Sequence, residues 1–267
     1  MRRMLPGPFL LILPHKQVEV VYDSYGNPIH ASQNYNIPCG CSSVFIALPL
    51  VLLVKWLCPT VIPFDLFAFW NLHGNPSQLV GDIWPFLVGT VLTALYWMFS
   101  PTLEENRWDF SYYWSQTGDF FKRTLWYYSF YALYEELAFR WLIFYSYIVG
   151  VTVLNYLLLG FAGHNLVQWL FTQALIPAAD FVTFYKLHDI LISNQYSWVV
   201  GAAILSANGK FRDGHSYQGW MGWIWSWYSG MFFFLIMFRY GLLVAVLVHI
   251  AHNLFKSWTA YLRVQFD

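Results

Sequence analysis

Long apolar runs broken by short polar stretches are the main pattern along this chain of 267 residues. A run of about 20 apolar residues is long enough to cross the roughly 30 Å hydrocarbon core of a membrane as a helix. The pattern predicts helices at residues 43–61, 79–99, 121–149, 151–176, 196–207, 220–238 and 240–261. We therefore predict an all-α fold, a polytopic transmembrane helical bundle with about seven or eight membrane helices, in an integral multi-pass membrane protein.

The segment before the first of these helices has a different character. Arg2 and Arg3 precede a short apolar piece at residues 9–13, which we interpret as an interfacial anchor. Residues 18–22 and the turn-forming residues that follow them predict a small extramembrane hairpin. We expect residues 1–41 to form an anchor and polar extramembrane segment, and residues 42–267 to form the membrane bundle.

Composition agrees with a membrane bundle. Hydrophobic residues make up 58% of the chain and charged residues 10%, against about 25% charged in soluble domains. The formal net charge is zero, so no nucleic-acid partner is indicated. Cys39 and Cys41 form a C-x-C pair and Cys58 follows. A metal pair or a disulfide remains open there, but the spacing typical of zinc sites is absent and unpaired cysteines are favoured.

One charged cluster interrupts the apolar run between Thr124 and Ala179, and it consists of Glu135, Glu136 and Arg140. Ionisable side chains at membrane depth are costly and usually mark a functional site. On a helix, Glu136 and Arg140 share a face and can form an ion pair. Glu135 lies about 100° around the helix from Glu136, so it is the carboxylate left over for chemistry.

Two further polar clusters lie in apolar surroundings, at residues 206–215 and 249–253. A carboxylate in a pocket of low dielectric constant can act as a general base near neutral pH. A histidine can share the attacking water or protonate a leaving amine, and an amide with an imidazole can stabilise an oxyanion. The candidate catalytic residues for these roles are Glu135, His215, His249 and Asn253.

Three short motifs occur along the chain in a fixed order: E-E-x-x-x-R, F-x-x-x-H and H-x-x-x-N. They are formed by Glu135, Glu136 and Arg140, by Phe211 and His215, and by His249 and Asn253. In these motifs the chain resembles the CPBP family of membrane-embedded proteases, which includes the type II CAAX prenyl endopeptidases and bacteriocin-processing proteins. The resemblance covers residues 121–255, about half of the chain.

The resemblance implies an intramembrane endopeptidase acting in the lipid bilayer on a membrane-associated or lipidated peptide or protein. It assigns water activation to Glu135 with His215, and an oxyanion hole to His249 with Asn253. Glu136, Arg140 and Phe211 would be supporting residues. These seven residues make up the candidate site.

The cofactor is unknown at this stage. A divalent metal such as zinc is one alternative, and Glu135, His215 and His249 would then be its ligands. The zincin pattern H-E-x-x-H is absent from the chain.

Two other functions stay open. The second motif is unusually polar, with Lys210, Arg212 and Asp213 around Phe211. A surface loop there would favour a catalytically inactive scaffold, or an immunity or regulatory protein, with the same fold. A transporter or channel could use buried Glu and His residues as a proton path, but no internal repeat supports it.

Overall fold

The structure is a computed structural model, and it describes residues 17–22, 28–34, 41–99, 120–158, 160–192, 198–216 and 219–266. The chain divides into two compact units, Met1–Leu53 and Val54–Asp267. The expected division into an anchor segment up to residue 41 and a membrane bundle stays a prediction. The predicted anchor at residues 1–13 lies outside the described residues, as does most of the charged loop at 101–123.

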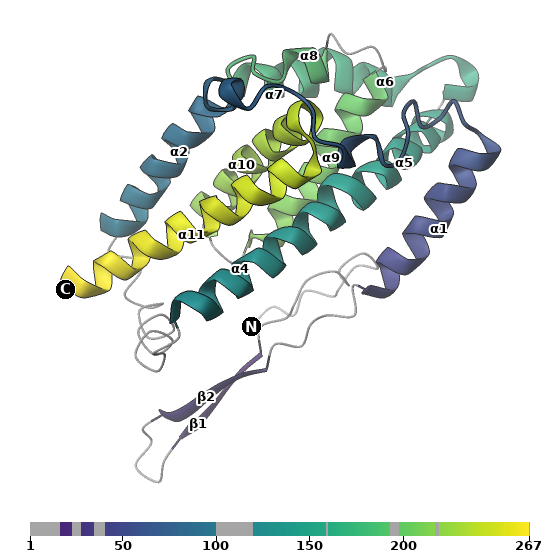
Figure 1. Cartoon of the computed structure of the whole chain (residues 1–267). Helices are drawn as coiled ribbons and strands as arrows, with labels where there is room; N and C mark the ends of the chain where they lie inside the picture. Colours follow the sequence, from purple (N-terminus) through teal and green to yellow (C-terminus); the bar gives the residue numbers. More distant parts are fainter. Residues whose placement is uncertain are drawn as a thin grey trace. The chain divides into compact units, whose positions relative to one another are not determined.

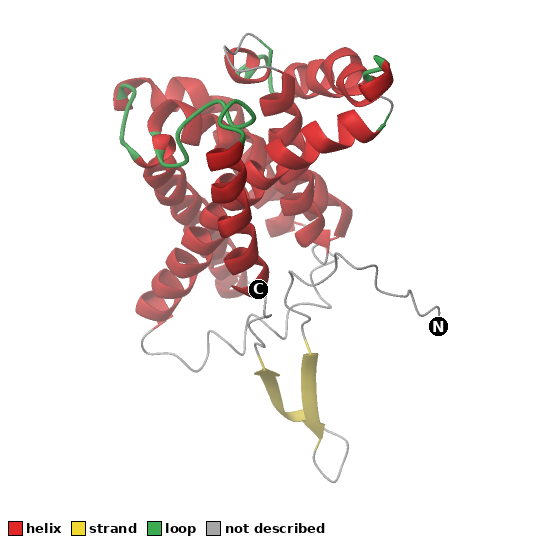
Figure 2. Ribbon diagram, turned by 90° about the vertical axis from the view of Figure 1, so that its right-hand side faces the viewer, coloured by secondary structure: helices red, strands yellow, loops and turns green. Residues whose placement is uncertain are grey.

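The first unit contains a two-stranded antiparallel hairpin, with strands β1 (Gln17–Tyr22) and β2 (Pro28–Asn34) (Figure 2). Val18 pairs with Gln33 and Val21 with His30, and the register shifts after Val21. The hairpin predicted at this place is therefore confirmed. The first helix of the chain, α1 (Cys41–Leu57), begins in the first unit and ends in the second.

Within the second unit, every regular element among the described residues is a helix (Figure 1). The helical segments are η1 (Ala68–Trp70), η2 (Pro76–Gln78), α2 (Leu79–Phe99), α4 (Phe120–Glu135), η4 (Glu136–Ile143), α5 (Phe144–Leu157), η5 (Gly160–Ala162), α6 (Leu166–Leu170), η6 (Phe171–Leu175), α7 (Ile176–Val182), α8 (His188–Leu191), α9 (Trp198–Gly214), α10 (Gly219–Tyr240) and α11 (Leu242–Phe266).

Three predicted helix boundaries need correction. The helix expected to end at residue 149 runs without a break through α4, η4 and α5 to Leu157, with no turn at Gly150. The single helix expected at 151–176 is therefore divided. The chain turns after Asn155, whose side-chain oxygen accepts a hydrogen bond from Gln168 N, 3.0 Å away in α6, and helix then continues through η6 and α7 to Val182. The helix expected at 196–207 continues to Gly214, so Phe211 lies on α9 and His215 directly follows the last residue of that helix.

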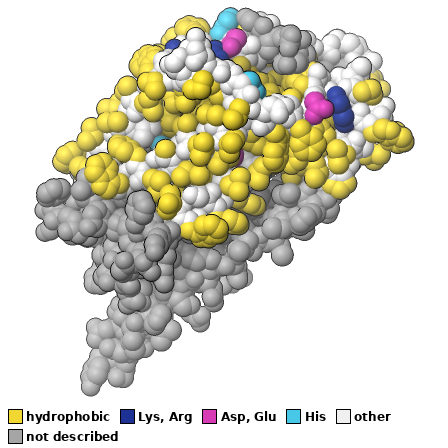
Figure 3. Space-filling view, in the orientation of Figure 1, with side chains coloured by type: hydrophobic (Ala, Val, Ile, Leu, Met, Phe, Trp, Pro, Cys, Tyr) yellow, Lys and Arg dark blue, Asp and Glu magenta, His cyan; other side chains and the backbone are white. Residues whose placement is uncertain are grey.

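Within the described ranges, three helices are long and apolar enough to span a membrane, at Pro76–Tyr96, Tyr128–Leu157 and Gly219–Tyr240. The larger number predicted, seven or eight, is not confirmed by this measure. Large apolar side chains along α2 are exposed, including Val80 at 64% and Leu92 at 60%. Hydrophobic side chains also cover most of the described surface seen in Figure 3. Exposed apolar surface of this extent is typical of contact with lipid.

Helix α10 forms the centre of the second unit. Its residues from Met231 to Met237 are almost completely buried, and it packs against α9, α11 and α2. Helix α4 packs beside α11 (Figure 1). This arrangement brings α4, η4, α9 and α11 together around one buried region.

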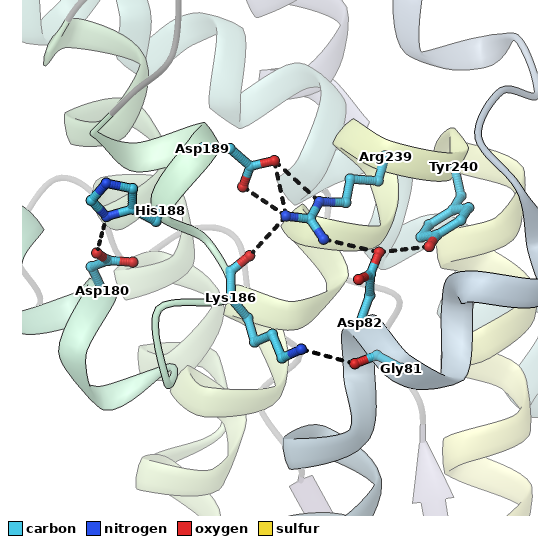
Figure 4. A network of polar contacts seen from close by, with 8 residues as sticks. All are labelled: Gly81, Asp82, Asp180, Lys186, His188, Asp189, Arg239 and Tyr240. Atoms are coloured by element: carbon cyan, nitrogen blue, oxygen red, sulfur yellow. Dashed lines mark hydrogen bonds and ion pairs between the residues drawn. The ribbon is translucent and has the colours of Figure 1, made fainter.

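The end of α10 is held by a polar network at Arg239 (Figure 4). Its guanidinium group forms ion pairs with Asp82 at 2.9 Å and with Asp189 at 2.8 Å. Tyr240 also donates a 2.6 Å hydrogen bond to Asp82, and Lys186 donates one of 2.9 Å to the carbonyl of Gly81. The network joins the beginning of α2, the segment around α8 and the end of α10.

The turn between α10 and α11 requires glycine at position 241, so we expect substitution of Gly241 to destabilise the fold. Gly241 has φ +97°, and a β-carbon there would lie 2.5 Å from the carbonyl oxygen of Asn71. Gly163 has φ +84°, and a β-carbon added there would have nothing within 4 Å. Gly163→Ala should therefore cost about 1–2 kcal/mol of backbone strain. Gly241→Ala should cost about 1–3 kcal/mol more, because of the added clash.

Thermal unfolding of both variants in the same detergent measures this difference. Equal shifts of the melting temperature would show that the close approach of Asn71 to the turn is absent in solution.

Candidate functional site

Glu135 is the last residue of α4, and the next eight residues form the π-helix η4. A π-helix has i→i+5 hydrogen bonds and is frequent at functional sites, where it changes the direction of neighbouring side chains. The side chain of Glu136 is 0% exposed, whereas that of Glu135 is 21% exposed. Two adjacent carboxylates thus have different environments.

The ion pair expected within the first motif is present. Arg140 Nε lies 3.4 Å from Glu136 Oε2, and both side chains are fully buried. The guanidinium group of Arg140 lies over the ring of Phe211, 3.9 Å from its centroid. Phe211 therefore supplies a cation–π contact to the arginine, which gives the second motif a direct contact with the first.

His249 lies between the two carboxylates. Its Nδ1 is 2.7 Å from Glu136 Oε1, and its Nε2 is 3.5 Å from Glu135 Oε2. Its ring stacks on Phe233 at a centroid distance of 4.4 Å. Because an ionised carboxylate can only accept, Nδ1 donates to Glu136. This bond directs Nε2 toward Glu135.

His215 approaches Glu135 from α9. Its Nδ1 donates a 2.8 Å hydrogen bond to the carbonyl of Phe211, and its Nε2 lies 3.9 Å from Glu135 Oε1. His215 lies outside the three candidate spans. Burial lowers the pKa of this histidine, and the negative charge of Glu135 opposes the shift. The side chain is 18% exposed, so the site is open to the surface at Glu135 and His215.

The structure thus brings three of the four candidate catalytic residues together, from α4, α9 and α11. Asn253, the fourth, is half-buried one helical turn beyond His249. Residues four apart share a helix face, so Asn253 lies on the side of α11 that carries His249. Among the described residues, no hydrogen bond joins its side chain to Glu135.

Three residues of this region were not singled out from the sequence. Phe233 is one apolar residue among many in its helix, and Gly230 has no side chain that would mark it. Asn208 falls inside the second polar cluster, and only its complete burial in the structure distinguishes it from the other residues there. The sequence does not reveal this burial, because an uncharged amide is common in helices.

The metal alternative is not supported by the side-chain geometry. In the described part of the chain, no group of three or more His, Cys, Asp or Glu residues is placed to hold a metal ion. The metal alternative at Glu135, His215 and His249 stays a prediction. Cys58 is a free, exposed cysteine, while Cys39 lies outside the described residues.

Comparison of the chain with protein-family models, with curated proteins and with solved structures gives no match. The assignment of function consequently depends on the residues themselves and on their geometry.

Proposed function

We propose that this protein is an intramembrane endopeptidase of the CPBP type, which hydrolyses a peptide bond with water activated by Glu135. The observation that carries the proposal is the position of Glu135. Its carboxylate is partly exposed and faces Nε2 of His249 at 3.5 Å and Nε2 of His215 at 3.9 Å. A carboxylate beside two imidazoles can accept, hold and return a proton.

The distribution of charge supports Glu135 rather than Glu136 as the base. Glu136 is engaged by Arg140 and by Nδ1 of His249, and it has no access to water. Glu135, Glu136 and Arg140 together carry one net negative charge, and the charge of Lys256 also acts on Glu135. The positive charge of Lys256, or a proton held by the histidines, offsets the negative charge of the cluster, which favours burial.

Each residue then has one role in the reaction. Glu135, with His215, takes a proton from water, and the water oxygen bonds to the carbonyl carbon of the substrate. His249 in its doubly protonated form donates from Nε2 to the developing oxyanion, and Asn253 assists. When the C–N bond breaks, the proton held by Glu135 or His215 passes to the leaving amine. The products are a free carboxylate and a free amine.

The depth of the site supports a substrate that reaches it from the membrane. His249 follows the turn at Gly241 by eight residues, which is about 12 Å along a helix. If the Arg239 network marks one membrane surface, this distance is close to half of a hydrocarbon core of about 30 Å. A bundle of about seven membrane helices and a lipidated or membrane-associated peptide substrate agree with this depth.

An inactive scaffold is the less favoured alternative. It depended on a surface loop around Lys210, Arg212 and Asp213 that would displace His215. These residues lie on α9, where Arg212 pairs with Asp213 at 2.7 Å, and His215 remains beside Glu135.

A peptide-cleavage assay tests the proposal. The purified protein in lipid nanodiscs is given lipidated C-terminal peptides in water enriched in ¹⁸O. Mass spectrometry should find cleaved product with one solvent oxygen in the new carboxylate.

The matched variants for this assay are two histidine substitutions. His249→Ala should lower the rate at least about 100-fold, because it removes the oxyanion donor. His188→Ala is the control, since His188 is half-exposed and pairs with Asp180 on a different part of the fold. Full activity of His249→Ala, or no cleavage of any peptide by the unaltered protein, would reject the proposed reaction.

A further inference from the structure

Asn208 occupies a completely buried position on α9, where it faces α10. Its Nδ2 donates a 2.7 Å hydrogen bond to the carbonyl of Trp227. Because a carbonyl can only accept, this bond fixes which end of the amide faces Trp227. The amide oxygen must therefore point away from it, and Oδ1 has no hydrogen-bond partner within the described part of the chain.

The guanidinium group of Arg140 lies at the same place. A β-carbon added to Gly230 would collide with Asn208 Oδ1 and would lie 3.1 Å from Arg140 Nη2. Asn208 Oδ1 and Arg140 Nη2 thus both lie next to the place where a side chain at Gly230 would be. Among the described residues, Nη1 and Nη2 of Arg140 also have no hydrogen-bond partner.

This arrangement favours a fixed orientation of Arg140. In a buried region the interaction of a charge with a nearby dipole is weakly screened, so the negative end of the amide attracts the cation strongly. Phe211 covers the face of the guanidinium group, and Asn208 lies near its edge. The absence of a side chain at Gly230 is what lets the amide oxygen come this close.

A continuous series of contacts leads from this place to the reacting groups. Arg140 contacts Glu136 at 3.4 Å, and Glu136 contacts Nδ1 of His249 at 2.7 Å. His249 faces Glu135 at 3.5 Å. A displacement of Arg140 would therefore change the partner that orients His249.

We propose that Asn208, seated against Gly230, is a positioning residue that holds Arg140 so that Glu136 keeps His249 directed at Glu135. The kinetic part of this inference rests on the proposed peptidase function, while the structural part does not. The competing explanation is that Asn208 only joins α9 to α10 through Trp227.

Two glycines of the same region provide the test. Gly230→Ala places a methyl group against Asn208 Oδ1, whereas Gly209→Ala adds the same methyl group to α9 where nothing lies within 4 Å. Gly209→Ala should behave like the unaltered protein. Gly230→Ala should lower kcat on the order of 100-fold, the cost of a catalytic group misplaced by about 1 Å, with KM nearly unchanged.

Asn208→Asp is a second variant in case Gly230→Ala does not fold. A carboxylate at this place competes with Glu136 for Arg140, so kcat should again fall while the folded protein is retained. A purely structural role would instead lower the melting temperature and leave kcat per folded molecule unchanged.

Nitrogen NMR of histidine-labelled protein in nanodiscs supplies a readout that does not need activity. The Nδ1–H signal of His249 reports its bond to Glu136, and it should change in Gly230→Ala and Asn208→Asp but not in Gly209→Ala. An unchanged signal in both variants overturns the positioning role, whatever the hydrolysis rates. A changed signal in a protein that cleaves no peptide would support the positioning role and reject only the peptidase assignment.

Discussion

Glu135→Gln should reduce peptide hydrolysis at least about 1,000-fold, because glutamine has nearly the same shape but cannot take a proton from water. The side chain of Glu135 is 21% exposed and belongs to no fully buried pair. Its replacement should therefore change the free energy of unfolding by less than about 1 kcal/mol. Loss of activity with retained stability is the expected result.

Asp213→Asn is the matched control for this variant. Asp213 is near His215 in the sequence, whereas Glu135 is near it only in space, and the side chain of Asp213 is 52% exposed. The same change from acid to amide at this position should leave the rate within about twofold. Initial rates on a lipidated peptide compare the two variants. A Glu135→Gln protein with more than a tenth of the original rate would show that the base is elsewhere.

Arg140→Met should destabilise the fold by about 3–5 kcal/mol, the usual cost of leaving one member of a buried ion pair without its partner. Arg140 and Glu136 are both 0% exposed, so water cannot replace the lost contact. Methionine fills much of the same volume, which keeps the cavity effect small. The loss is therefore attributable mainly to the stranded carboxylate of Glu136.

The double variant Glu136→Gln/Arg140→Met tests this reason. It removes both charges, and the glutamine oxygen still accepts the hydrogen bond from Nδ1 of His249. The double variant should recover at least about 1 kcal/mol relative to Arg140→Met. Pulse proteolysis in nanodiscs gives the stabilities. A double variant as unstable as the single one would mean that packing, and not charge, explains the loss.

The polar side chains of the site could be predicted from the sequence because burying an ionisable side chain in an apolar segment is energetically unfavourable and usually marks a function. Glu135, Glu136 and Arg140 interrupt a long apolar run, and their spacing alone predicted the ion pair now found at 3.4 Å. The second helix was predicted with its bounds, Leu79–Phe99, since a long apolar run between polar stretches specifies both ends. The hairpin at residues 17–34 was also predicted from turn residues between two strand-like runs.

Other features depend on tertiary contacts and leave no pattern in the sequence. The end of α5 at Leu157 depends on a hydrogen bond between Asn155 and Gln168. The attachment of His249 to Glu136 joins residues that are far apart in the chain, and the place of Asn208 is decided by a glycine on another helix. The π-helix is hidden because eight residues are too few to separate its period from that of an α-helix.

That π-helix decides where along this segment the chain can lose one residue. A π-turn holds about one residue more than an α-turn. Deleting one residue between Leu137 and Ile143 would therefore let i→i+4 bonding resume while the helix on either side keeps nearly its present register. Deleting one residue from the α-helical part before Glu135 has no such compensation, and it would turn what precedes the deletion by about 100° relative to the site. An in-frame loss of one codon should therefore disturb the helix less inside the π-helix than outside it, provided that Arg140 is kept.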